Sequence, residues 1–156
     1  MPTLTRLLGI DLGESRIGLA IADTQTGSVK PLRTIRRADA SRDAATLATL
    51  SAEQRIDEIV VGLPLNMDGS EGPQAASTRE WLAAVKPLLG RRVTWHDERL
   101  SSVAAEERIG RPARGRSGGP PSAAARNGRR ARIDREAAAE ILQAEMDSRT
   151  GDERTL

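Results

Sequence analysis

The first 36 residues alternate between short apolar runs and polar turns. Residues 6–11 are apolar between Arg6 and Asp11, residues 17–22 are apolar throughout, and the polar segment GESR lies between the two runs. A second turn signal, TQTGS at 24–28, precedes a more polar run over 29–36. Runs of this length between turn residues are typical of β-strands. The pattern therefore predicts three consecutive strands in an antiparallel meander.

The pattern changes after residue 40. Apolar residues recur at helical spacing over about 41–54 and again over 74–89, which predicts two helices. The β-branched run 56–62 is typical of a buried parallel strand, and 92–97 predicts a further strand. This element order resembles the ribonuclease H-like topology. We expect an α/β fold with a mixed five-stranded sheet, three antiparallel strands and then two parallel ones, flanked by helices.

The C-terminal third contains a compositionally biased segment. A short helix is predicted over 101–109, and the Gly, Pro, Ser and Arg content of 110–128 predicts a mobile loop. Asp134 is expected to open the last helix, in which apolar residues again recur at helical spacing. Without internal repeats, residues 1–148 are predicted to form a single domain, and the polar residues 149–156 a frayed tail.

Composition narrows the function classes. The 156 residues include no cysteine, which excludes disulfides, thiolate metal sites and thiol nucleophiles. No apolar segment reaches the length of a signal peptide core or of a membrane span. We therefore expect a soluble, cytoplasmic chain without a membrane partner.

Positive charge is concentrated in one part of the chain. The net charge is only +2, but nine arginines and a single acid, Asp134, lie between residues 108 and 135. Such a block is typical either of a segment that faces nucleic acid or of a solvated loop, and phosphate is the natural partner in both cases. The only aromatic residues, Trp81 and Trp95, are expected to pack in the core or against helices. Recognition of the nucleic-acid backbone is therefore favoured over base stacking.

Three carboxylates stand out against this basic background. Asp11 ends the first predicted strand, Glu98 follows the last, and Asp134 begins the final helix. Each has a local alternative, as a turn residue, an ion-pair partner of an arginine or a helix N-cap. Ligands gather at the carboxyl ends of strands in open α/β sheets, and three crowded carboxylates there require a compensating cation. Oxygen ligands without cysteine favour Mg²⁺ or Mn²⁺, which can activate water for phosphodiester hydrolysis.

Four segments together resemble one known family. GIDLGESRIGLAIAD, IVVGLPLNMDGSEGPQA, HDERLSS and IDREAAAEILQ are similar, in this order, to the four sequence blocks of the YqgF/RuvX family. Its members are known as Holliday-junction resolvases and as nucleases of pre-16S ribosomal RNA. The resemblance implies a ribonuclease H-like fold whose catalytic and metal-binding acids are Asp11, Glu98 and Asp134. Asp97 is an additional candidate beside Glu98, although strand alternation turns the two side chains to opposite faces.

Other residues are expected to bind the phosphates of the substrate. The loop 63–72 leads into a helix N-terminus, where free N–H groups can hold a phosphate, and the alternative is a plain turn at 67–69. Arg16 and Arg99 flank the proposed acids and can bind phosphate or pair with carboxylates. His96 is expected to have a polar partner rather than to act as a general base. The nucleic-acid-binding candidates are Arg16, Asn66, Ser70, Gln74, Arg99, Arg129, Arg130 and Arg132.

The expected function is metal-dependent hydrolysis of phosphodiester bonds, in the 5′-end maturation of pre-16S ribosomal RNA. Two alternatives on the same fold are resolution of branched DNA, for which a homodimer is expected, and non-catalytic binding of nucleic acid. The GIDLG hairpin also resembles the phosphate-binding hairpin of actin-like ATPases. Those proteins need two such lobes, and this chain has one hairpin.

Overall fold

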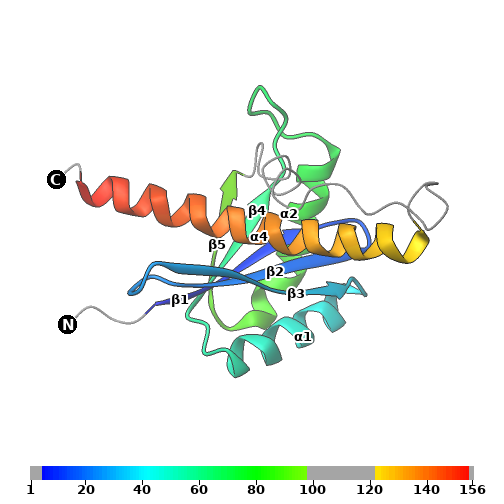
Figure 1. Ribbon diagram of the computed structural model, residues 1–156, viewed down its shortest axis with the longest axis horizontal. Helices are drawn as coiled ribbons and strands as arrows, with labels where there is room; N and C mark the ends of the chain where they lie inside the picture. The colour runs from blue at the N-terminus through cyan, green and yellow to red at the C-terminus, as the bar shows by residue number, and fades with distance from the viewer. Residues whose placement is uncertain (1–4, 98–121, 155–156) are drawn as a thin grey trace.

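The computed structural model describes residues 5–97 and 122–154, and Figure 1 shows how their helices and strands are arranged. The elements are β1 (Arg6–Leu12), β2 (Arg16–Asp23), β3 (Ser28–Arg36), α1 (Ala40–Glu53), β4 (Glu58–Leu63), α2 (Pro73–Leu89), β5 (Arg92–Asp97) and α4 (Ala123–Arg154). The helix predicted over 101–109 and most of the loop predicted over 110–128 lie outside the described residues.

The strands form one mixed sheet in the order β3-β2-β1-β4-β5. β1 pairs antiparallel with β2, and β2 pairs antiparallel with β3. On the other side of β1, β4 and then β5 are added in parallel. The predicted sheet, with three antiparallel strands followed by two parallel ones, is confirmed.

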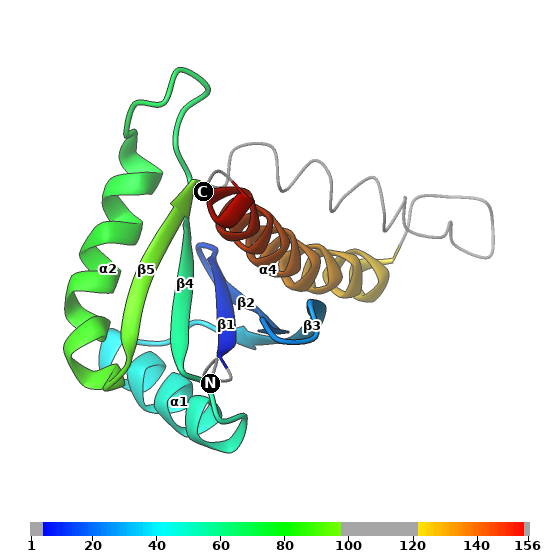
Figure 2. The same ribbon diagram turned by 90° about the vertical axis from the view of Figure 1, so that its left-hand side faces the viewer.

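Helices cover both faces of this sheet, as Figure 2 shows. α1 and α2 pack on one face, where Leu8 and Ile10 of β1 belong to the larger apolar core. α4 lies across the other face, against Leu7 of β1, Ala20 of β2 and Val60 of β4. Because side chains alternate between the two faces of a strand, the odd-numbered residues of β1 face α4.

Capping residues set the ends of the first two helices. α1 begins at Ala40 because the Asp39 carboxylate accepts the Arg42 N–H at 2.9 Å. α2 continues through Pro87 and ends at Gly90, whose φ of +65° is the left-handed conformation that favours glycine. The predicted stop at Gly90 is therefore confirmed.

The last helix is longer than the sequence predicts. α4 begins at Ala123 and continues to Arg154, so Asp134 lies within the helix and does not open it. The loop prediction is wrong over 123–128, and the frayed-tail prediction for 149–156 is wrong as far as Arg154.

Local chemistry explains the early start of α4. Alanine and arginine, which dominate its first turns, are strong helix formers. The Ser122 hydroxyl accepts the Ala125 N–H at 3.1 Å, as an N-cap does. None of the helices in the described part of the chain has the length and apolarity needed to cross a membrane.

Candidate functional site

Asp11 lies on the face of β1 that α4 covers. Leu7 of the same strand packs against α4, and a Cβ added to Gly9 would lie 2.6 Å from Leu142 of that helix. Side chains of a strand alternate between its two faces, so Asp11, two residues after Gly9, points to the same face as Leu7. In the antiparallel register Asp11 opposes Gly18 of β2, so the two side-chain positions share one face. The partly buried Asp11 carboxylate is thus directed to the α4 side.

α4 contacts the sheet directly at Gly18. A Cβ on Gly18 would lie 2.0 Å from the backbone oxygen of Asp134 and 3.0 Å from its Cβ. Only glycine allows the helix to come so close. Since opposed Cβ atoms on antiparallel strands lie about 4.5–5.5 Å apart, the Cβ atoms of Asp11 and Asp134 are at most about 8.5 Å apart. The structure therefore brings these two predicted site residues together.

Arg16 pairs with Asp134 beside this contact. Its Nε donates to Oδ2 of Asp134 at 2.8 Å, and the side chains keep 32% and 21% exposure. Of the two roles predicted for Arg16, pairing with a carboxylate is present in this structure. Both side chains remain accessible to a ligand.

Asp97 lies on the opposite face from Asp11. His96 contacts Glu145 of α4, so the side chain of its neighbour Asp97 alternates to the other side of β5. Asp97 is therefore not brought together with Asp11.

Glu98 and Arg99, two of the predicted site residues, lie outside the described residues. Within residues 5–97 and 122–154, no group of three or more His, Cys, Asp or Glu side chains could hold a metal ion. That finding does not extend to the predicted trio, since one of its carboxylates belongs to Glu98.

The loop between β4 and α2 folds back on itself. Asn66 Nδ2 donates to the Ser70 hydroxyl at 3.0 Å, and Asp68 Oδ1 accepts both the Ser70 N–H and its hydroxyl at 2.9 and 2.6 Å. Gly69, with φ of +88°, closes the turn. The side chain of Asn66 also lies against Gly72, the N-cap of α2, where an added Cβ would be 3.1 Å from its Oδ1.

The start of α2 is open to an anion. Gly72 provides no side-chain cap, and Pro73 occupies the first position of the helix. Gln74 follows with an exposed side chain. Uncapped N–H groups in a first helical turn are suited to bind phosphate. The predicted group Asn66, Ser70 and Gln74 is thus collected around one helix end.

The predicted arginines of α4 lie in its first half. Arg130 and Arg132 are exposed, and Arg129 is partly buried. This half of the helix is attached to β3 by a 2.6 Å hydrogen bond from the Thr34 hydroxyl to the Ala131 carbonyl. The arginines are therefore carried on a helix fixed to the sheet.

A charged network attaches the second half of α4 to β4 and β5. His96 Nδ1 lies 2.8 Å from Glu145 Oε2, and Arg149 joins Glu145 to the buried Glu58. Burial acts to raise the pKa of Glu145, but hydrogen bonds and electrostatic attraction from the side chains of His96 and Arg149 hold it below its ordinary value of 4.5. Burial acts to lower the pKa of Arg149, but the carboxylates of Glu58 and Glu145 raise it overall. The predicted polar partner of His96 is confirmed.

The two tryptophans differ in environment. Trp81 is buried, and its Nε1 donates to Asp43 at 3.0 Å, as expected of a core residue. Trp95 is 51% exposed, with the Arg79 guanidinium carbon 5.3 Å from its ring centroid. Trp95 is therefore not a core residue, because β5 is an edge strand, but its cation–π contact with Arg79 of α2 agrees with the predicted packing against a helix.

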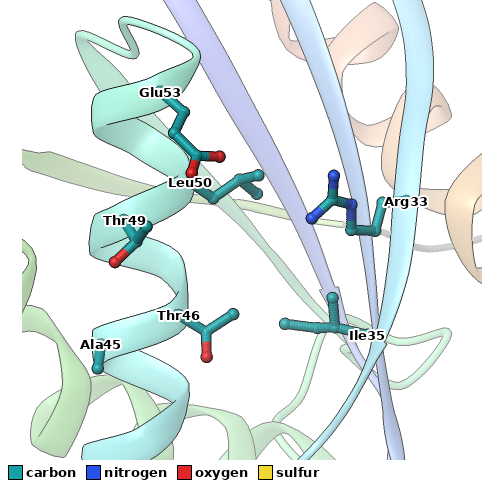
Figure 3. Close-up of a pocket in the computed structure, with 7 residues that line it drawn as sticks. All are labelled: Arg33, Ile35, Ala45, Thr46, Thr49, Leu50 and Glu53. Carbon is teal, nitrogen blue, oxygen red and sulfur yellow. The ribbon is translucent and has the colours of Figure 1, made fainter.

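Two hollows adjoin the outer strands of the sheet. One, of about 350 Å³, lies between β3 and α1, with Arg33, Thr46 and Glu53 among its lining residues (Figure 3). It is on the face away from Asp11. The other, of about 330 Å³, lies between α4 and strands β2 and β3, and its lining includes Arg16.

The most informative residue that the sequence interpretation missed is Gly18. A glycine inside an otherwise apolar strand is a recognised signal of close backbone approach. The signal indicates that something approaches the strand, but it does not indicate which segment does.

Asp11 and Asp134, which the structure brings near each other, have the carboxylate oxygens that a hard divalent cation prefers as ligands. Fold and site together define a ribonuclease H-like protein with an acidic candidate metal site. Within that class, the chain belongs to the RuvX family. The family model, described as "RuvX: Holliday junction resolvase", matches residues 5–148.

Relatives and solved structures agree with this assignment. A Ruegeria pomeroyi protein named "Putative pre-16S rRNA nuclease" is 40% identical over 147 residues, covering 94% of this chain and 89% of the relative. A Rhodobacter capsulatus protein of the same name is 50% identical over 106 residues, covering 68% and 67%. The structure "T. thermophilus RuvC in complex with Holliday junction substrate" is 18% identical, with a TM-score of 0.55 over 94% of this chain and 96% of that one. This last likeness shows the fold.

Proposed function

We propose that this chain is a metal-dependent nuclease that hydrolyses phosphodiester bonds in the 5′-end maturation of pre-16S ribosomal RNA. The observation that carries the proposal is the approach of Asp134 to Asp11 over Gly18 on one face of the sheet. Relatives that carry the pre-16S rRNA nuclease name support the substrate. A precursor of ribosomal RNA as substrate supports a cytoplasmic site of action for this chain.

In this proposal Asp11, Asp134 and Glu98 hold Mg²⁺ or Mn²⁺. Asp11 comes from the central strand of the sheet, and Asp134 from a helix that rests on that sheet, so both carboxylates are held rigidly. An ion held by these residues would supply the Lewis acidity needed to activate water and to stabilise the leaving oxygen of a phosphodiester. Asp97, on the opposite face, has no ligand role.

Arg16 has two tasks. Its Nε holds one oxygen of Asp134 at 2.8 Å, which orients that carboxylate. A guanidinium has five N–H donors, so the others can donate to a substrate phosphate beside the acids. The positive charge next to the carboxylates also attracts the polyanionic substrate.

The remaining predicted contacts bind the nucleic-acid backbone. The start of α2, with Asn66, Ser70 and Gln74 around it, offers uncapped N–H groups and neutral donors. The arginines of α4 add sequence-independent, salt-dependent affinity. These contacts involve Arg129, Arg130 and Arg132 in the first half of the helix, with Arg99 as a further candidate.

A cleavage assay tests the proposal. Purified chain is incubated with a pre-16S rRNA fragment and Mg²⁺, Mn²⁺ or a chelator, and the products are mapped. We expect cleavage with the metal ions, none with the chelator, and loss of cleavage with retained RNA binding in Asp11→Asn. Asp39→Asn is the matched control, because Asn caps α1 as well as Asp does. Binding without cleavage under every metal condition would instead support a non-catalytic factor.

A second candidate function is resolution of branched DNA. The description of the matching family model, "RuvX: Holliday junction resolvase", favours it. A four-way junction tested beside the RNA separates the two functions. Symmetric cutting of the junction requires two active sites and therefore a homodimer, which sedimentation with the junction would detect. Cleavage of RNA alone would exclude this candidate.

A further inference from the structure

The hollow between α4 and strands β2 and β3 collects positive charge. Its volume is about 330 Å³, and three arginines line it: Arg16 from β2, Arg36 from β3 and Arg135 from α4. The volume is near the lower end of the ~300–1,000 Å³ typical of small-molecule sites. It is therefore large enough for a phosphate group with its sugar.

The strand register places like charges directly opposite each other. Arg16 and Arg36 are cross-strand partners in the antiparallel pair of β2 and β3. Opposed side chains share a face about 4.5–5.5 Å apart at Cβ, and like charges in that position are destabilising. The register thus keeps two like charges close together, an arrangement that a nearby anion stabilises.

The carboxylates among the described residues compensate only part of the positive charge of this pocket. Asp134 pairs with Arg16. No carboxylate among the described residues forms an ion pair with Arg36 or Arg135. With three guanidinium groups and one carboxylate, the pocket has an excess of two positive charges, and a backbone phosphate, which carries one negative charge, neutralises half of that excess.

Neutral donors complete the lining. Ser15 and Asn127 line the same pocket and can donate through a hydroxyl and an amide group. The Thr34 hydroxyl is engaged with the Ala131 carbonyl and holds the wall of the pocket together. Guanidinium forks match the oxygens of a phosphate in pairs, more closely than an ammonium would.

The pocket lies next to the paired carboxylates. Arg16 is two residues from Gly18 along β2 and on the same face, a separation of about 6.8 Å. Asp11 and Asp134 meet over Gly18. The spacing is comparable to that between successive phosphates of a nucleic-acid strand.

We propose that Arg16, Arg36 and Arg135 form a pocket for one backbone phosphate of the substrate, adjacent to the phosphate that is cut. This inference rests on the proposed function for the position of the cut, but binding in the pocket can be tested without cleavage. The pocket sets where the strand lies relative to the acids, so it positions the substrate and does not take part in bond breaking.

The test compares the wild type with two variants in nucleic-acid binding without catalytic metal. Arg36→Gln and Arg135→Gln, combined, remove two of the guanidinium groups. Arg33→Gln is the matched control, because it makes the same charge change on β3 but lines the hollow on the α1 face (Figure 3). By fluorescence anisotropy over a salt series we expect about tenfold weaker binding for the double variant. We also expect a salt slope smaller by about 0.7–0.9, the value of one phosphate contact. Unfolding midpoints confirm that the variants fold.

A neutral methylphosphonate at one linkage at a time identifies the phosphate concerned. One linkage, next to the cut, should weaken binding to the wild type and to Arg33→Gln but have no effect on the double variant. Equal effects on all three proteins, or equal affinities of the double variant and Arg33→Gln, would overturn the pocket. If inorganic phosphate binds in the pocket but the double variant keeps the nucleic-acid affinity of the wild type, the pocket is a site for free phosphate only. That result would also overturn the proposal. A different outcome is that the chain cleaves no substrate while the double variant still binds nucleic acid more weakly and with a smaller salt slope than the wild type. In that case the proposed function fails, but the proposed phosphate pocket is supported.

Discussion

Replacing Gly18 by alanine puts a methyl group where the backbone of α4 lies. The new Cβ would be 2.0 Å from the Asp134 carbonyl oxygen, whereas ordinary contacts begin at 3.4 Å. The helix must therefore retreat by roughly 1.4 Å, or the strand must bend by as much. Overpacking of this kind lowers the free energy of unfolding by about 1–3 kcal/mol.

The retreat also separates Asp134 from Asp11. Misplacement of catalytic groups by about 1 Å reduces rates by about 100-fold, so we expect a loss of this order in kcat for RNA cleavage. Urea unfolding and single-turnover cleavage at 20 °C measure the two effects on one preparation. Gly128→Ala is the matched control, since its nearest neighbour, Arg132, would lie 3.7 Å away. Because alanine is a better helix former than glycine, Gly128→Ala should raise the free energy of unfolding by about 0.5–1 kcal/mol without changing cleavage.

Wild-type stability and cleavage in Gly18→Ala would refute the reasoning. That result would mean that α4 does not rest on Gly18, and that the approach of Asp134 to Asp11 is not what supports activity. A loss of activity in Gly128→Ala equal to that in Gly18→Ala would refute it as well.

Three further outcomes are expected. Arg149→Met leaves the buried Glu58 carboxylate with a weaker partner, and denaturant unfolding should show a loss of about 2 kcal/mol; an unchanged midpoint would exclude the ion pair. Because the pKa of Glu145 is held below 4.5, its contribution to stability is complete above that pH and is lost as the pH falls through the folded-state value. Glu145→Gln should therefore flatten the acid limb of the stability curve, and a curve parallel to the wild type would contradict this. Trp81→Phe removes a donor to the buried Asp43 and should lower the free energy of unfolding by about 1–3 kcal/mol with cleavage unchanged.

The sheet could be predicted from the sequence because its signals are local. The turn between β1 and β2 and the apolar strands on either side of it can be identified from the residues alone, and so can the stop of α2 at Gly90. Alternation and turn chemistry act within a few residues, so they need no knowledge of the rest of the chain.

The start of α4 could not be predicted in the same way. Its local signals conflict, because Gly128 and the neighbouring polar residues favour a loop whereas the alanines and arginines around them favour a helix. The helix is also stabilised by contacts distant in the sequence, such as the bond from Thr34 to the Ala131 carbonyl. Tertiary packing of this kind overrides local propensity.

The candidate site could be predicted in part. Asp11 and Asp134 are identified by their motifs, but their approach depends on strand register and on the docking of α4 at Gly18. Arg36 lies outside the four motif segments, and Arg135 lies in the last of them without being marked there as a binding residue. Arg36 meets Arg16 because β3 pairs with β2 in one particular register, and Arg135 joins them because α4 packs on these strands. Such contacts between distant segments are fixed by the folded structure.

Binding of Mn²⁺ to the metal-free protein tests the central claim most directly, because it asks whether Asp11 and Asp134 serve one site. Electron paramagnetic resonance of free Mn²⁺ gives the affinity of wild type, Asp11→Asn, Asp134→Asn and the control Asp39→Asn. We expect wild type and the control to bind alike, and each of the other two variants to bind at least about tenfold more weakly. Unchanged affinity in either Asp11→Asn or Asp134→Asn would contradict a shared site.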